Sequence, residues 1–172
     1  MRWFIILLCI PVFIGTHMVH EQLIEQLPLK KNANESFALL PSEFLQLTSL
    51  GHDALNADFL WLQLIQYYGA AIKSKQTAIH LYDYFDTLTT LEPHFEQAYI
   101  FAAYLMADKP EAALKVLKKG MRLNPSSSDI FFQAGFVSFL YLKKPIAAAA
   151  YFEQAADLPN ANPNAELSLI HI

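Results

Sequence analysis

The sequence predicts an all-α protein in which an N-terminal membrane-anchor helix precedes about three helical hairpins. The chain of 172 residues is 54% apolar, has only five glycines and is rich in Leu and Ala, and this composition favours helix over sheet. Its N-terminus is a long apolar run. Further along, Pro93, Pro125 and Pro159 each end an apolar segment and lie 32 and 34 residues apart. A period near 34 residues is typical of stacked helix–turn–helix units.

Residues 3–19 predict the membrane anchor. Arg2 precedes twelve unbroken apolar residues, Trp3 to Ile14, and the stretch of low polarity extends to Val19. Its seventeen residues are near the lower limit for a spanning helix. A cleaved secretory signal is an alternative, although no small-residue cleavage site follows, and a buried core helix is another. In the preferred interpretation Arg2 stays in the cytoplasm and the remainder is exported.

The polar stretch after the anchor divides the chain. Residues 1–26 are expected to hold the signal anchor and a short juxtamembrane helix, and residues 27–41 a linker. A helical repeat domain is expected over 42–160, with Ser42 able to cap its first helix. Residues 161–172 form a tail.

Three positions recur before each repeated proline. They lie 5, 8 and 12 residues before Pro93 and Pro125, and one residue closer before Pro159. The spacing of four and then three places them on one helix face. The positions are Leu81, Phe85 and Leu88, then Ala113, Leu117 and Gly120, and then Ala148, Phe152 and Ala155. The small residues predict close approach of two helices, with Gly120 and Gly135 at close contacts and Gly69 in a loop.

A second set of residues lies on the predicted helix that precedes each of these three groups in the sequence. The three groups are Trp61, Leu64, Ile65 and Tyr68, then Tyr99, Ala102 and Ala103, and then Phe131, Ala134 and Gly135. Together the two sets resemble the tetratricopeptide repeat (TPR). The family pattern has an aromatic residue, Leu, Gly and Tyr on the first helix, and Ala, an aromatic residue, Ala and Pro on the second. The first repeat departs from it, because Ile65 replaces the Gly and two leucines replace the alanines. From Asp53 to about Pro159, the resemblance implies a right-handed TPR-like solenoid.

The resemblance also implies a place for a partner. In this family the first helix of each hairpin lines an inner groove that takes a peptide or helix of another protein. By register, the groove residues here are Phe59, Leu62, Gln66, Ile100, Tyr104, Phe132, Phe136 and Phe139. The last three belong to residues 130–142, whose aromatic side chains surround a helix, and such a helix is either buried on all sides or binds something. The alternatives to the groove are a further repeat that covers one side and a second membrane span, for which the apolar length is short.

A narrower resemblance concerns residues 49–69, SLGHDALNADFLWLQLIQYYG. With the apolar N-terminus before it, this segment is similar to the start of N-terminally membrane-anchored bacterial TPR proteins of unknown function. The similarity implies a protein of the bacterial inner membrane with its repeat domain on the periplasmic side.

The last six residues, LSLIHI, resemble sequencing-adapter DNA translated at the end of a reading frame. The alternative is a genuine short apolar tail that packs on the last hairpin. A repeat array usually ends in a polar capping helix. None is evident in this sequence, which points to further repeats.

No motif of known chemistry appears. The six histidines form no HExxH pair, the single cysteine is Cys9, and no G-x-S-x-G, P-loop or Rossmann fingerprint is present. We therefore expect no enzyme, no cofactor and no metal, and a net charge of −4 argues against nucleic acid as a partner. The alternative is a hydrolase that uses His52, Asp53 and Asp58. The simpler interpretation of these residues is helix capping by Asp53 and solvated polar side chains.

The segment after Pro110 carries a basic face. Glu111 and Lys115 have the spacing of an ion pair, and Lys118, Lys119 and Arg122 continue the face. We interpret it as a solvated helix face with cations near the C-terminal end of the helix dipole. The alternative is a docking patch for an acidic partner or for lipid headgroups.

These observations predict a membrane-anchored, extracytoplasmic scaffold or assembly factor of the bacterial envelope. It would bind another protein, through a peptide or helix, without any covalent step. The alternative is a purely structural repeat within a larger envelope complex.

Overall fold

The computed structural model describes residues 39–158, 160–161, 164–165 and 168. Every regular element in this part of the chain is helical, which confirms the all-α prediction. The elements are α2 (Ser42–Thr48), α3 (Asp53–Lys73), α4 (Leu81–Leu91), α5 (Glu96–Leu105), α6 (Pro110–Leu123), α7 (Ser128–Phe136), the π-helical segment η2 (Val137–Tyr141) and α8 (Pro145–Ala156).

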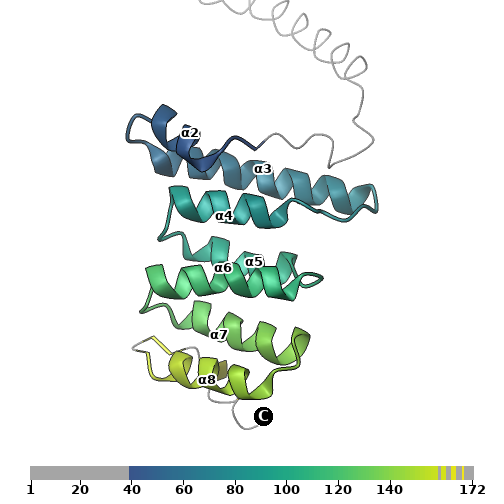
Figure 1. Ribbon diagram of the computed structural model, residues 1–172, viewed down its shortest axis with the longest axis vertical. Coiled ribbons are helices and arrows are strands. Elements are labelled where there is room, and N and C mark those ends of the chain that lie inside the picture. The colour runs from purple at the N-terminus through teal and green to yellow at the C-terminus, as the bar shows by residue number, and fades with distance from the viewer. Residues whose placement is uncertain (1–38, 159, 162–163, 166–167, 169–172) are drawn as a thin grey trace, which may run out of the picture.

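Consecutive helices pair into three hairpins, α3 with α4, α5 with α6 and α7 with α8, and the hairpins follow one another along the long axis of the molecule (Figure 1). Helix α2 lies across the first hairpin and contacts both of its helices. The contacts α4 to α5 and α6 to α7 join neighbouring hairpins, and α4 also meets α6 while α5 meets α7. The first helices of the hairpins therefore form one layer and the second helices the other. We call them the first-helix layer (α3, α5, α7) and the second-helix layer (α4, α6, α8).

The positions that recur before the prolines form the inner face of the second-helix layer. All nine are buried, as the sequence predicts, and Phe85, Leu88 and Leu117 are fully so. On the opposing helices, Leu64 and Tyr99 are fully buried as well. The four-then-three spacing therefore identifies the core face correctly in all three hairpins.

Two of the hairpins are held close by an aromatic ring that packs on a glycine. A Cβ atom on Gly120 of α6 would lie 2.6 Å from Cδ1 of Tyr99 on α5. In the third hairpin the roles are exchanged, because Gly135 lies on the first helix and its Cβ would lie 2.6 Å from Cε1 of Phe152 on the second. Both predicted close contacts are present. The prediction of a loop at Gly69 is wrong, because α3 continues through it to Lys73. A Cβ atom on Gly69 would have no neighbouring atom within 4 Å.

Substitution of these three glycines by alanine is expected to have opposite effects. Alanine is the better helix former by about 1 kcal/mol, so Gly69→Ala should raise the free energy of unfolding by about 0.5–1 kcal/mol. At Gly120 and Gly135 the new methyl group meets a buried ring, and overpacking costs about 1–3 kcal/mol. Both variants should therefore be destabilised despite their better helix propensity. Urea unfolding of the three variants measures the difference, and equal stabilisation in all three would contradict the close contacts.

The turn between α2 and α3 does not use the predicted caps. Helix α2 begins at Ser42 and α3 at Asp53, and neither start has a side-chain capping hydrogen bond. Both residues already belong to the helix, so neither stands at the capping position. Instead, the hydroxyl of Ser49 donates to the Asp53 carboxylate, and Nδ2 of Asn56 donates to the carbonyl of Leu45 at 3.0 Å. These polar groups fasten α2 to the start of α3.

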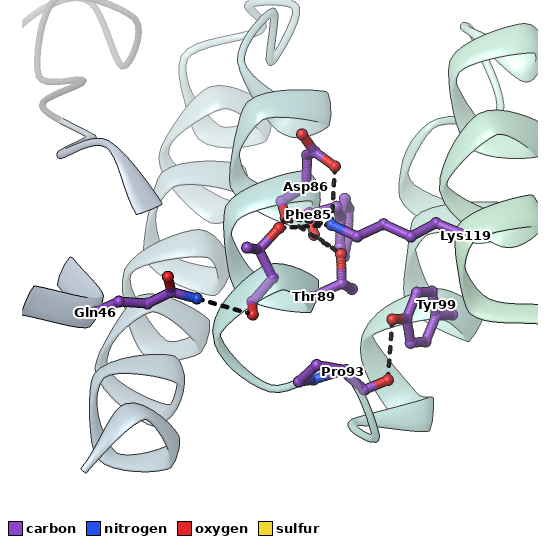
Figure 2. A network of polar contacts seen from close by, with 8 residues as sticks. Gln46, Phe85, Asp86, Thr89, Pro93, Tyr99 and Lys119 are labelled. Atoms are coloured by element: carbon purple, nitrogen blue, oxygen red, sulfur yellow. Dashed lines mark hydrogen bonds and ion pairs between the residues drawn. The ribbon is translucent and has the colours of Figure 1, made fainter. Parts of the chain in front are cut away.

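The turns that follow Pro93 and precede Pro125 are locked together. The carbonyl of Pro93 accepts from Nδ2 of Asn124 at 2.8 Å and from the Tyr99 hydroxyl at 3.0 Å, the second of which is drawn in Figure 2. The buried Asn124 also meets Nδ1 of His94 at 2.9 Å through its Oδ1. The polar groups at the boundary between the first two hairpins are thus satisfied within the protein.

Lys119 of α6 connects the second-helix layer by polar contacts with α4. Nζ of Lys119 lies 2.8 Å from the carbonyl of Asp86 and 3.0 Å from its Oδ1 (Figure 2). It also lies 2.7 Å from Oγ1 of Thr90. From the other side, Nε2 of Gln46 on α2 reaches the Thr90 carbonyl at 3.4 Å. Helix α4 is therefore held by polar contacts from α2 and from α6.

Helix α3 is turned relative to the register that the repeat pattern predicts. Its buried residues are Ala57, Leu60, Leu64, Tyr67 and Ala71. Ile65, expected at the close-contact position of a Gly, is instead 41% exposed. Trp61 packs edge-on against Phe95 and Phe101, with ring centroids 5.3 and 5.1 Å apart. It joins the first hairpin to α5 rather than filling the first hairpin itself.

The predicted anchor at residues 3–19 lies outside the described residues, as do the linker up to residue 38 and most of LSLIHI. Among the helices of the described part, none is both long and apolar enough to cross a membrane. Of the tail, Ala165 is fully buried, and Oγ of Ser168 donates to the carbonyl of Asn164 at 2.8 Å.

Candidate functional site

The eight predicted groove residues all belong to the first-helix layer or its π-helical extension. Phe59, Leu62 and Gln66 come from α3, Ile100 and Tyr104 from α5, and Phe132, Phe136 and Phe139 from α7 and η2. Five of them are exposed, namely Phe59, Leu62, Gln66, Tyr104 and Phe139, and the other three are partly buried. None belongs to the fully buried core.

The exposed side chains of this layer are large and apolar. Phe59 is 62% exposed, Leu62 56% and Tyr104 55%. Exposed apolar residues scattered singly are ordinary, but a set that recurs along neighbouring helices marks a surface that contacts something else. We call this set, with the rest of the eight residues, the apolar face.

The first-helix layer carries few charges. Helix α3 has only Asp53, Asp58 and Lys73 among 21 residues, α5 has only Glu96 and α7 only Asp129. Helix α6 of the other layer has five charged residues among 14. A helix face exposed only to water is normally rich in charge. Helix α6 is the exception in its layer, because α4 has only Asp83 and Asp86 and α8 has only Glu153. What marks the apolar face is therefore the exposure of its large apolar side chains on helices that carry few charges to solvate them.

One polar pair lies within the apolar face. Nε2 of Gln133 on α7 donates to the hydroxyl oxygen of Tyr104 on α5 at 2.8 Å. Because the Tyr104 oxygen accepts this bond, its own hydroxyl hydrogen can still be donated, and the residue is 55% exposed. Oε1 of Gln133 is buried and has no hydrogen-bond partner in the described residues. The sequence does not predict this role of Gln133, because a single Gln in an apolar helix does not indicate which neighbouring helix its side chain contacts.

Helix α7 widens into the π-helical segment η2 at its C-terminal end. The amide of Leu142 donates to the carbonyl of Val137 at 3.1 Å, five residues back. The widening leaves Ser138 fully buried, with a hydroxyl that lacks a partner in the described part, while Phe139, Leu140 and Tyr141 are exposed by 39, 41 and 37%. Single π-helical turns are frequent at functional sites. The sequence, which predicts one continuous helix over 130–142, gives no sign of it.

Two hollows border the apolar face. One, of about 310 Å³, lies where α3 and α5 end, and its walls include Tyr68, Ile72, Tyr104 and Leu105. The other, of about 140 Å³, lies between α2 and α3 beside Phe59 and Leu60. Ligand pockets are mostly apolar hollows with a few polar groups. The first hollow is more polar than this, because Gln76, Thr77 and Asp108 also line it, and Tyr104 links it to the apolar face.

The residues of the hydrolase alternative are not assembled into a site. The Asp53 carboxylate accepts a hydrogen bond from Ser49. His52 stands before the first turn of α3 without a side-chain capping bond, and Asp58 is exposed on the helix. The described residues also contain no group of three or more His, Cys, Asp or Glu side chains that could hold a metal ion.

Comparison of the chain with protein-family models, with curated proteins and with solved structures found no match. The function is therefore argued from the residues of this chain alone.

Proposed function

We propose that this chain is a scaffold of the TPR type, whose apolar face binds an amphipathic helix or peptide of another protein. The proposal depends on one observation above the others: large apolar side chains are exposed side by side along α3 and α5, on helices that carry few charges. Covering them removes apolar surface from water, which contributes about 25 cal/mol for each Å² buried.

The chemistry of the face indicates what the partner presents. Phe59 and Leu62 offer aliphatic and aromatic contact from α3, and Phe139 does so from η2. Tyr104 between them offers a hydroxyl that accepts from Gln133 and can still donate its own hydrogen. Tyrosine and other aromatic residues are enriched among the residues that dominate binding energy at interfaces. The partner is accordingly expected to lay an apolar stripe across the face and to accept a hydrogen bond from Tyr104.

The expected anchor over residues 3–19 gives this scaffold a location. A membrane-anchored helix would hold the repeat domain at the outer side of the bacterial inner membrane, so that the partner is an envelope protein. The binding involves positioning only and no covalent chemistry. The purely structural alternative differs in one respect, since the apolar face would then be covered permanently within a larger complex.

Photo-cross-linking from the apolar face tests the proposal. A photoreactive amino acid at Leu62 of the full chain, expressed in bacterial cells, is expected to yield a discrete adduct with another protein. The control position is Ile146 on α8, which is equally apolar and 88% exposed but belongs to the other layer. It should yield no such adduct. Adding Phe59→Asp to the Leu62 probe should abolish the adduct, because a charge cannot be buried against an apolar partner.

Two outcomes would overturn the proposal. One is the same adduct from Ile146 as from Leu62, because the contact would then be nonspecific. The other is an adduct at Leu62 that survives Phe59→Asp, because the apolar face would then contribute nothing to the binding. An adduct whose yield stays constant through the whole growth cycle would favour the purely structural alternative.

A further inference from the structure

A pocket between α6, α7 and α8 is not used by the proposed function. It measures about 540 Å³, within the usual range for ligand pockets. Residues of α6, α7 and α8 line it. Four of them are the cations of the basic face, Lys115, Lys118, Lys119 and Arg122, and the apolar residues are Met121, Phe131 and Tyr151. Phe131, Met121 and Tyr151 are all partly buried, so they form the floor while the cations form the rim.

Two of the four cations are already engaged within the protein. Lys119 is held by Asp86 and Thr90. Lys115 does not form the predicted ion pair with Glu111, because its ammonium group lies over the ring of Tyr82 on α4, 4.6 Å from the ring centroid. At an exposed site a cation–π contact and an ion pair with a carboxylate are of similar strength. The predicted i, i+4 pair is therefore wrong in this structure.

The other two cations, Lys118 and Arg122, are exposed and have no ion pair in the described part of the chain. No Asp or Glu lines the pocket. The whole protein carries a net charge of −4, so this cationic rim stands out against an acidic background. A concave site lined by charges of one sign concentrates ligands of the opposite sign.

We propose that this pocket binds an acidic peptide segment of a partner protein, at a site separate from the apolar face. An aromatic or large aliphatic side chain of the segment enters the pocket and packs on Phe131 and Tyr151. Flanking carboxylates pair with Lys118 and Arg122, and the planar guanidinium of Arg122 suits a carboxylate because it can donate two parallel hydrogen bonds. The site combines an apolar floor with a cationic rim, and neither a purely apolar nor a purely anionic ligand would use both.

An anionic membrane surface shares the charge but not the shape. A flat layer of headgroups would pair with the cations without filling the hollow of about 540 Å³ that lies among them. Each basic residue near an anionic bilayer adds only about fivefold to the affinity. Two free cations are therefore too few for stable attachment to lipid headgroups, while a peptide gains in addition from filling the pocket.

A fluorescein-labelled peptide, with a central phenylalanine flanked by two glutamates on each side, tests the site. Its binding to the full chain in mild nonionic detergent is followed by fluorescence anisotropy. We expect saturable binding that weakens as salt is added. The charge-reversal pair Lys118→Glu/Arg122→Glu should weaken binding at least tenfold, and replacing the central phenylalanine of the peptide with alanine should weaken it as well.

The control pair is Lys73→Glu/Lys144→Glu. It changes the net charge by the same amount, and Lys73 occupies the last turn of α3 as Arg122 occupies the last turn of α6. The control should alter the affinity less than about threefold, since distant surface charges are screened. An equal loss in both pairs would overturn the proposal, because the peptide would then respond only to net charge. An alanine peptide that binds as well as the phenylalanine peptide would overturn the role of the pocket.

The membrane is tested in the same series. Co-sedimentation with vesicles of phosphatidylcholine and phosphatidylserine that depends on Lys118 and Arg122, together with no peptide binding, would replace the peptide by lipid headgroups and overturn the proposal. The Leu62 cross-link should persist in the Lys118→Glu/Arg122→Glu variant. Failure of this site and failure of the apolar face are thus distinguished.

Discussion

Replacing Phe152 with alanine is expected to lower the free energy of unfolding by about 3–5 kcal/mol. The side chain is 2% exposed. Its ring packs against Phe132, with centroids 5.4 Å apart, and covers the backbone at Gly135. The cavity left behind has a glycine on one side and Ala148 and Ala155 beside it on α8, all buried. These residues have no side-chain atoms that could move in to fill it, so the cost should lie toward the upper end of the range.

Phe59→Ala is the matched control for this substitution. Phe59 is 62% exposed, and truncation of an exposed side chain usually changes stability by less than about 0.5 kcal/mol. Urea unfolding followed by circular dichroism measures both variants against the parent. A loss below about 1 kcal/mol for Phe152→Ala would mean that the third hairpin is not closely packed around this ring. A large loss for Phe59→Ala would show that the apolar face is part of the core rather than a binding surface.

The second helices of the hairpins could be predicted from the sequence, because their faces differ clearly. Helix α6 alternates Ala113, Leu117 and Gly120 with Lys and Arg. Only one face of such a helix can be buried without placing a charge in the core. The positions before the prolines could therefore only be assigned to the core face, and in the structure all of them are buried.

The first helices could be predicted less well, because they are apolar on several faces. On α3 the set Leu55, Phe59 and Leu62 is as hydrophobic as the set Leu60, Leu64 and Tyr67, and only the second is buried. Hydrophobic periodicity cannot choose between two such stripes. The family pattern predicts a register with Ile65 at the position of a Gly, whereas Ile65 is 41% exposed and Trp61 packs against Phe95 and Phe101.

Contacts between different helices could not be predicted, because a residue pattern describes only the faces of a single helix. The four-residue spacing predicts that Lys115 pairs with Glu111. In the structure Lys115 instead contacts the ring of Tyr82, which lies 33 residues away on α4. The basic face was visible in the sequence. Its apolar floor was not, since Phe131 and Tyr151 come from two other helices. For the same reason the sequence could not anticipate the Gln133–Tyr104 hydrogen bond or the π-helical turn at Val137.

Raising the pH from 10 to 12 is expected to destabilise the protein by about 2–3 kcal/mol through Tyr99 alone. Burial raises the pKa of the Tyr99 hydroxyl to about 12, and the carboxylates of Asp86 and Glu92 also raise it. Below pH 10 both the folded and the unfolded chain hold the phenolic proton, so this group gives no pH dependence. Between pH 10 and 12 the unfolded chain releases the proton while the folded chain retains it, which lowers stability by about 1.4 kcal/mol per pH unit. Above the folded pKa no further loss arises from this group.

Tyr99→Phe isolates the contribution of this hydroxyl. The variant keeps the ring that packs on Gly120 and loses the hydrogen bond to the Pro93 carbonyl, which still accepts from Asn124. It should therefore be less stable than the parent by about 0.5–1.5 kcal/mol near pH 8. As the pH rises past 10, the parent should lose its advantage, and near pH 12 the variant should be the more stable protein. Tyr67 and Tyr84, whose pKa values burial also raises, are present in both proteins and cancel in the comparison. Urea midpoints that stay a constant distance apart from pH 8 to 12 would show that the Tyr99 hydroxyl reaches water, and that the first two hairpins do not close over it.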